Sequence, residues 1–170
     1  MKQKTIFQRI FGVGPLGYVV TVLIWYFTYT IERAAGFPQI AISSSFRLLL
    51  LIVFVTDAVY LIFGGLYQLI KNGWGKNLIK AGPYRLIRHP LYSAVIYSGT
   101  GALAIFFYSW AILISVLPIS LFWSWMVQKE ETQLINKFGD DYKSYMEISG
   151  QFLPSFKKLR KLEAEDNKRQ

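Results

Sequence analysis

The stretch that decides the fold is Leu91 to Gln128, "LYSAVIYSGTGALAIFFYSWAILISVLPISLFWSWMVQ", which holds no charged side chain in 38 residues. A single membrane-spanning helix needs about 20 apolar residues. The run is therefore long enough for two helices joined by a tight turn, which we expect at Tyr108-Ser109. Pro118 would then kink the second of these helices or mark a break in it. Because each half is short for a bilayer crossing, a tilted or re-entrant hairpin also fits.

Two further apolar runs precede this stretch, and the second of them carries a single charge, Asp57. Hydrophobic residues make up 53% of the chain and charged residues 17%, against about 25% charged in soluble domains. The sequence therefore predicts an all-α integral membrane bundle of about four transmembrane helices in one domain, residues 1–170. The predicted spans are residues 13–31, 48–70, 91–108 and 109–128. The first is too long for the apolar region of a signal peptide, so we expect it to be retained.

The net charge of +9 is concentrated beside the apolar runs. The N-terminus carries Lys2, Lys4 and Arg9, and the connector 71–90 carries five basic residues and no acid. Basic loops favour the cytoplasmic side of a membrane, so we expect a multi-pass protein with both termini in the cytoplasm. The basic residues, including the cluster "KKLRK" at 157–161, are expected to contact anionic membrane lipids and not nucleic acid.

Short helices are expected after the last apolar run. The segment from Glu130 to Phe138 continues as a helix, and Gly139 is a typical residue to end it. Asp140 is a good N-cap for a second short helix through Ile148. The sequence therefore predicts two cytoplasmic segments, residues 71–90 and 129–155. The chain has no cysteine and one histidine, so we expect no metal site.

The connector contains "GPYRLIRHPLY", residues 82–92, which gathers most of the groups suited to chemistry. Pro90 suits the first turn of a helix, and the free N–H groups at a helix start bind carboxylates and phosphates. One interpretation is that these arginines and tyrosines only contact lipid headgroups. The acid pair Glu130-Glu131, on the same side of the membrane, instead favours a zwitterionic ligand held between a basic helix start and an acidic helix end.

Three motifs, in order, carry a resemblance to a known family. "GPYRLIRHPLY" is followed about 40 residues later by "EETQLINKFGDDYKSYM" (130–146) and "FLP" (152–154). The pattern Gly-x-Tyr-x-x-x-Arg-His-Pro-x-Tyr, a Glu pair, and Phe-Gly-x-x-Tyr-x-x-Tyr resembles the isoprenylcysteine carboxyl methyltransferase family, whose relatives are the phospholipid methyltransferases. The resemblance covers about residues 66–155.

The resemblance implies a membrane methyltransferase that binds S-adenosylmethionine and takes a lipophilic small molecule or prenylated acceptor from the bilayer. Arg88 and Glu130 are the implied catalytic residues. The implied cofactor-binding residues are Gln68, Lys76, Asn77, Leu78, Ile79, Tyr84, His89, Pro90, Leu91, Tyr92 and Glu130.

The chemistry of the cofactor is compatible with these assignments. The helix start and His89 would hold its carboxylate, and Glu130 would pair with its ammonium. Tyr84 and Tyr92 would face the sulfonium, because aromatic faces attract cations. A carboxylate acceptor needs no general base, whereas an amine acceptor must lose a proton, which Glu130 would assist.

One position departs from the family pattern. The prenylcysteine enzymes carry an arginine about one turn before the catalytic glutamate, and the corresponding residue here is Met126. This argues against a prenylcysteine carboxylate and in favour of another lipid or apolar acceptor. Two other functions remain open: a membrane reductase that uses NADPH, and a non-catalytic scaffold or transporter subunit.

Asp57 has two interpretations. A carboxylate within a membrane span is a functional candidate, but it would equally serve as a hydrogen-bond partner of Ser98 or Thr100 inside the bundle. We expect Gly99 and Gly101 to allow close helix packing, and Trp110, Trp123 and Trp125 to pack or to lie at the interface.

Overall fold

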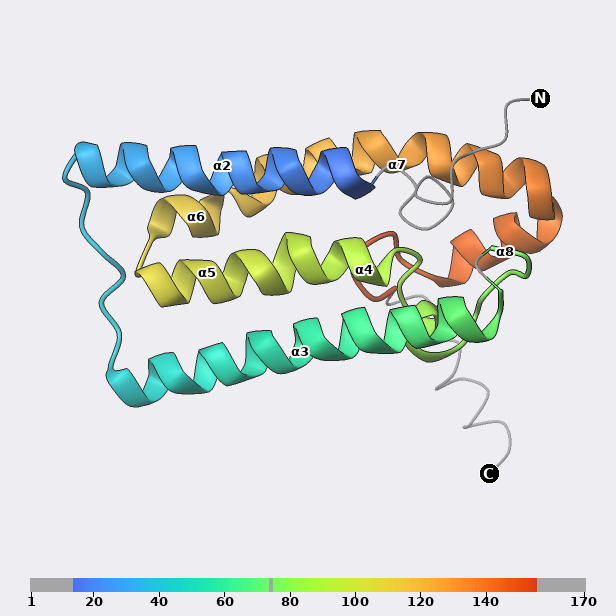
Figure 1. Ribbon diagram of the computed structural model, residues 1–170, viewed down its shortest axis with the longest axis horizontal. Helices are drawn as coiled ribbons and strands as arrows, with labels where there is room; N and C mark the ends of the chain where they lie inside the picture. Colours follow the sequence, from blue (N-terminus) through green and yellow to red (C-terminus); the bar gives the residue numbers. More distant parts are fainter. Residues whose placement is uncertain (1–13, 74, 156–170) are drawn as a thin grey trace.

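The computed structural model describes residues 14–73 and 75–155 (Figure 1). The predictions for the basic N-terminus, for the first residue of the first span and for the cluster at 157–161 lie outside these residues. Four helical segments are long and apolar enough to cross a membrane, and the part of the chain just given contains no strand. The all-α fold with four predicted spans is confirmed.

The helices follow the predicted order. The first two crossings are α2 (Gly14–Ala34) and α3 (Ser44–Lys71). The third is continuous from Pro90 to Phe107 and consists of α4 (Pro90–Ser93), the π-helical segment η2 (Ala94–Gly99) and α5 (Thr100–Phe107). The fourth consists of α6 (Trp110–Ile114) and α7 (Val116–Phe138). The short 3₁₀-helix η1 (Gly82–Arg85) lies in the connector, and α8 (Asp140–Ile148) follows α7.

The predicted turn between the last two crossings is confirmed at Tyr108-Ser109. Tyr108 adopts the left-handed conformation with φ 53°, which ends α5. The Ser109 side chain accepts a hydrogen bond from the backbone N–H of Ile112 at 3.1 Å, which is the usual way of capping a helix start.

The break in the fourth crossing lies at Ser115, three residues before Pro118. A proline has no backbone N–H, and its ring clashes with the carbonyl four residues earlier. For Pro118 that carbonyl belongs to Ile114, the last residue of α6. The proline therefore causes the break without lying in it. Beyond the break α7 continues through Phe138 and ends at Gly139, as predicted. The next helix also ends at Ile148 as predicted, but Gly139 is its N-cap and Asp140 is its first residue.

Three charged side chains hold the turn between α5 and α6 from the ends of the first two crossings. Glu32, at the end of α2, is buried and accepts hydrogen bonds from Ser109 and from the N–H of Ala111. Arg33 donates to the carbonyl of Phe107 and Arg47 to that of Phe106. The acid lies at a helix start and the two bases at a helix end, as the helix dipole favours.

Glycines allow the crossings to approach one another closely. A methyl group on Gly17 of α2 would lie 2.5 Å from the ring of Trp123, and one on Gly101 of α5 would lie 2.5 Å from Phe54. Trp123 is fully buried and donates its indole N–H to Thr21 of α2 at 2.9 Å. The predicted packing role of Gly101 is confirmed, whereas a methyl group on Gly99 would meet its neighbours, among them Trp25, only at ordinary contact distances of 3.4 Å or more.

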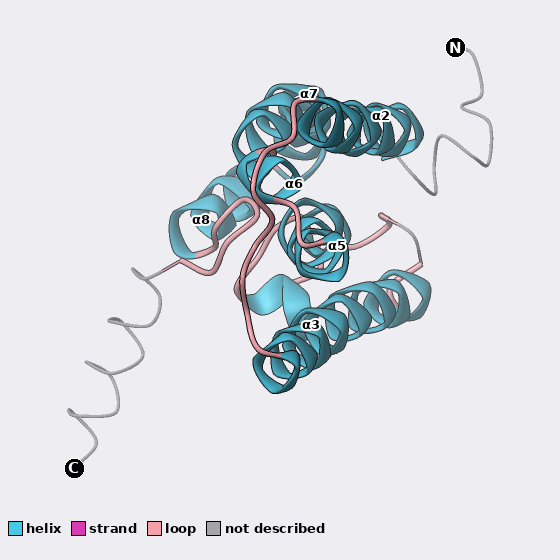
Figure 2. Ribbon diagram, turned by 90° about the vertical axis from the view of Figure 1, so that its left-hand side faces the viewer, coloured by secondary structure: helices cyan, strands magenta, loops and turns pink. Residues whose placement is uncertain are grey.

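Viewed end-on, α2 and α7 lie side by side, α3 lies at the opposite side, and α5 lies between them (Figure 2). Large apolar side chains cover the outer faces of α2 and α3, where Leu16 is 63% and Phe63 is 67% exposed. A soluble protein rarely exposes so many, so these faces are suited to contact lipid. The connector, the end of α7 and α8 gather at one end of the bundle (Figure 1).

Candidate functional site

The connector and the start of the third crossing pack against α3 at two adjacent glycines. A methyl group on Gly64 would lie 3.0 Å from the ring of Pro83, and one on Gly65 would lie 2.7 Å from the side chain of Leu91. Only a residue without a side chain leaves room for these contacts. The two glycines therefore fix where η1 and the start of α4 lie.

Residues 149–152, named the strap, hold the connector from the other side. The backbone N–H of Arg88 donates to Gly150 at 2.8 Å, that of His89 to Gln151 at 3.1 Å, and that of Gly150 to Leu86 at 2.9 Å. The Ser93 hydroxyl donates to the carbonyl of Phe152 at 2.6 Å. The helix start is thus fixed by a segment far along the chain.

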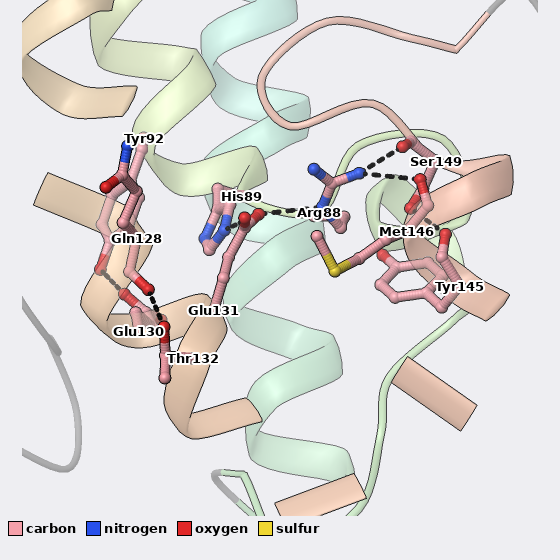
Figure 3. Close-up of polar contacts among 10 residues, drawn as sticks. All are labelled: Arg88, His89, Tyr92, Gln128, Glu130, Glu131, Thr132, Tyr145, Met146 and Ser149. Atoms are coloured by element: carbon pink, nitrogen blue, oxygen red, sulfur yellow. Dashed lines mark hydrogen bonds and ion pairs between the residues drawn. The ribbon is translucent and has the colours of Figure 1, made fainter. Parts of the chain in front are cut away.

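Arg88 joins three elements (Figure 3). Its Nε donates to Oε1 of Glu131 on α7 at 3.0 Å, and its Nη1 donates to the carbonyls of Met146 and Ser149 at the end of α8. Only 10% of the Arg88 side chain is exposed. A cation at a helix C-terminus satisfies carbonyls that have no helical partner, so Arg88 fixes α8 and the strap to α7.

Glu131 is the residue that contacts His89. The two side chains approach to 3.2 Å between Oε1 of Glu131 and Nε2 of His89 (Figure 3). The same carboxylate oxygen accepts from Arg88. All three side chains are at least 90% buried, so this is a desolvated network in which each charge has a partner.

Glu130 belongs to a second network. Its Oε2 accepts a hydrogen bond from the hydroxyl of Tyr92 at 3.0 Å, and Tyr92 stacks on the ring of His89 with centroids 5.5 Å apart. Tyr18 of α2 contacts Tyr92 at 6.3 Å between centroids. Burial, and after it the charge of Glu130, raises the pKa of Tyr84. Glu130 therefore lies among tyrosines, and it makes no ion pair with the residues described.

Other implied cofactor residues occupy the connector and its edges. Gln68 lies 3.2 Å from the position a methyl group would take on Gly82, which has φ +58°. Asn77 donates to the carbonyl of Asn72 at 3.4 Å. Ile79 is buried, and Lys76 is exposed. The remaining implied residues are Leu78 and Leu91, which are half-buried, and Pro90, which is buried.

Sequence reasoning named Glu131 only as part of an acid pair and missed its contacts with Arg88 and His89, and it missed the strap. The signal for Glu131 is present in α7, where Ile119, Trp123 and Val127 are fully buried and recur every four residues. The next position in this series is Glu131 and not Glu130. The strap could not be predicted in this way. It is held mainly by backbone hydrogen bonds, which do not depend on a repeating pattern of side chains.

Asp57 accepts a hydrogen bond from Ser98 of η2, as one of its two interpretations predicted. Thr100 instead accepts from Trp25 at 3.1 Å. We expect Asp57→Asn to leave ligand affinity at the connector unchanged within twofold, because asparagine keeps the oxygen that Ser98 contacts. Isothermal titration before and after the substitution measures this, and a tenfold loss would assign Asp57 a role in ligand binding.

The polar groups of this site are of the kind that bind an organic ligand. Within residues 14–73 and 75–155, no group of three or more His, Cys, Asp or Glu side chains is placed to hold a metal ion. The site offers a carboxylate among aromatic rings, an imidazole and a helix start. Such groups are suited to a ligand that carries both a positive charge and hydrogen-bonding groups.

A protein-family model described as "Isoprenylcysteine carboxyl methyltransferase (ICMT) family" matches residues 51–136, just over half of the 170-residue chain. The match includes most of α3, the connector, the third crossing, nearly all of the fourth, and the two glutamates. No curated protein matches the sequence.

Proposed function

Because the chain belongs to the isoprenylcysteine carboxyl methyltransferase family, we propose that it is a membrane methyltransferase that uses S-adenosylmethionine and acts on a lipophilic acceptor from the bilayer. Membership of the family implies methyl transfer at a membrane. The cofactor, the acceptor and the residues that bind them are the finer points of the proposal.

The observation that carries the proposal is the setting of Glu130. This carboxylate lies against Tyr92 and near Tyr84, and none of the described residues forms an ion pair with it. A half-buried anion among aromatic rings is suited to a cation, since ring faces attract a cation by about 0.5–2 kcal/mol. S-adenosylmethionine carries two positive groups and, when bound, supplies the methyl group on its sulfonium.

Different residues of the chain would bind different groups of this cofactor. Glu130 would pair with the ammonium, and Tyr84 and Tyr92 would face the sulfonium. The free N–H groups at the start of the third crossing, after Pro90, would hold the carboxylate. Gln68 and the segment 76–79 would line the rest of the site.

These residues would accelerate the reaction mainly by positioning. Methyl transfer is an in-line displacement, and holding two reactants in the correct geometry supplies much of the rate enhancement. If the acceptor is a carboxylate it is already ionised and needs no base. If it is an amine, it must lose a proton, which Glu130 would accept.

Met126 limits the acceptor. It lies on α7 one turn before Glu130, is 92% buried, and stands where the prenylcysteine enzymes are expected to carry arginine. A prenylcysteine carboxylate would have no cation at this position, and Lys129, the nearest base in the sequence, is exposed. This favours an acceptor whose reacting group is not an anion, although prenylcysteine remains the family's substrate.

We further propose that the connector end of the bundle faces the cytoplasm. The exposed lysines at this end include Lys71, Lys76 and Lys80 of the connector and Lys137 of α7. The opposite end carries Glu32 against Arg33 and Arg47, all three engaged with helix ends. The imbalance supports both termini on the cytoplasmic side.

Two measurements on the purified protein in nanodiscs test the proposal. Isothermal titration with S-adenosylmethionine and with NADPH identifies the cofactor, and binding of NADPH alone would support a reductase instead. Incubation with radiolabelled S-adenosylmethionine, extracted lipids and a prenylcysteine analogue, followed by mass spectrometry, identifies the product. Binding of neither cofactor would favour a scaffold or transporter subunit.

A further inference from the structure

His89 is a buried polar side chain with one nitrogen engaged. Its side chain is 4% exposed, and Nε2 lies 3.2 Å from Oε1 of Glu131. The other nitrogen, Nδ1, makes no hydrogen bond with any part of the chain that the structure describes. A ring nitrogen that makes no hydrogen bond within the protein is available to a ligand, so Nδ1 is a position where a ligand group would be stabilised.

The contact with Glu131 decides what Nδ1 offers. In a neutral imidazole one nitrogen donates and the other accepts. Glu131 is acceptor-only when ionised, so Nε2 must carry the hydrogen, which leaves Nδ1 as an acceptor. The hydrogen bond made by one ring nitrogen of a histidine commonly determines in this way whether the other nitrogen carries a proton.

Arg88 allows Glu131 to remain ionised in this buried position. Its guanidinium donates to the same oxygen that faces His89, at 3.0 Å. The guanidinium is itself held by two carbonyls at the end of α8. The negative charge of Glu131 is therefore balanced by Arg88, and His89 need not be protonated to compensate for it.

We propose that Arg88 and Glu131 are positioning residues that hold His89 in the Nε2-protonated form, so that Nδ1 accepts a hydrogen bond from a hydroxyl or ammonium group of the bound ligand. This inference rests on the proposed function only for the identity of that ligand. It gives His89 the opposite polarity to the carboxylate contact expected from the sequence, and it places Arg88 outside direct contact with the reacting atoms.

The state of His89 is directly observable because it is the only histidine in the chain. With ¹⁵N-histidine in the ligand-free protein, all imidazole signals belong to this residue. We expect at neutral pH a pyrrole-like Nε2 with an attached, slowly exchanging proton, and a pyridine-like Nδ1. An imidazolium, with both nitrogens protonated, or a proton on Nδ1 would overturn the proposal.

Variants of Glu131 separate positioning from a purely structural role. Glu131→Gln keeps an oxygen that accepts from Nε2, whereas Glu131→Leu removes it. We expect the glutamine variant to retain the Nε2-protonated signal and the leucine variant to show a mixture of both forms. Equal spectra for the two variants, with thermal unfolding showing both folded, would contradict the inference. If the leucine variant does not fold, the spectrum of the glutamine variant still decides, because loss of the Nε2 proton there contradicts the role of Glu131.

Ligand binding supplies the second readout. Adding S-adenosylmethionine is expected to shift the Nδ1 resonance more than Nε2, and Arg88→Lys is expected to weaken affinity about tenfold, because lysine cannot reproduce the forked contacts of arginine. Lys143→Gln is the matched control, since Lys143 pairs with Asp140 on the exposed face of α8. A shift confined to Nε2 would contradict the acceptor role. If the cofactor does not bind at all, the proposed function fails, and the ligand-free spectrum still decides the role of Glu131.

Discussion

Glu130→Gln is expected to weaken the binding of S-adenosylmethionine about thirtyfold and to reduce methyl transfer at least as much. Glutamine has the same shape and keeps an oxygen for the hydroxyl of Tyr92, so the substitution removes the charge and little else. Truncating one partner of a desolvated ion pair costs about 2–5 kcal/mol, and the lower value applies because Glu130 is half-buried. Isothermal titration gives the affinity, and a radiolabelled-methyl assay gives the rate.

Glu147→Gln provides the control for this experiment. Glu147 is an exposed acid on α8, and the same change of charge there is expected to alter affinity less than twofold. If the Glu130 and Glu147 variants bind the cofactor equally well, then Glu130 does not pair with its ammonium. The family assignment would stand, and the assignment of the cofactor site would not.

Gly150→Ala is expected to disrupt the strap and with it the candidate site. A methyl group on Gly150 would lie 1.7 Å from the carbonyl oxygen of Leu153, which is backbone and cannot rotate away. Both hydrogen bonds of Gly150 to the connector depend on the present geometry. Overpacking of this kind costs roughly 1–3 kcal/mol, so thermal unfolding should begin several degrees lower, and cofactor affinity should fall at least tenfold.

Gly99→Ala is the matched control for Gly150→Ala. A methyl group there would meet its nearest neighbour at 3.4 Å, an ordinary contact, and alanine is favoured over glycine in helices. We expect its unfolding temperature to be no lower than that of the unchanged protein and its ligand affinity to be the same. If Gly150→Ala also had no effect, the strap would not be needed to hold the start of the third crossing.

The crossings were predictable because each depends on local composition. An uncharged run longer than one span requires a turn, and a polar pair such as Tyr108-Ser109 is where it is least unfavourable. The break at Ser115 follows from Pro118 once the clash with the carbonyl of Ile114 is considered. The residues of the connector were also identifiable, since they are the only dense group of polar side chains between apolar runs.

The partners within the site were not predictable in the same way. Adjacent residues of a helix point about 100° apart, so the choice between Glu130 and Glu131 depends on how α7 is rotated against its neighbours. The contact of Arg88 with α8 depends on a helix that follows it by some 50 residues in the sequence. The π-helical segment η2 likewise arises from packing and has no signature in composition.

The strap also sets the order in which the protein becomes competent during its synthesis. All four membrane helices leave the ribosome before residues 149–152 do, so they can insert and assemble while the connector still lacks its pairing at Gly150. A nascent chain stalled between α7 and the strap would therefore be integrated in the bilayer with Arg88 unsupported by α8. Competence for ligand would therefore follow insertion, once residues 149–152 have paired with the connector.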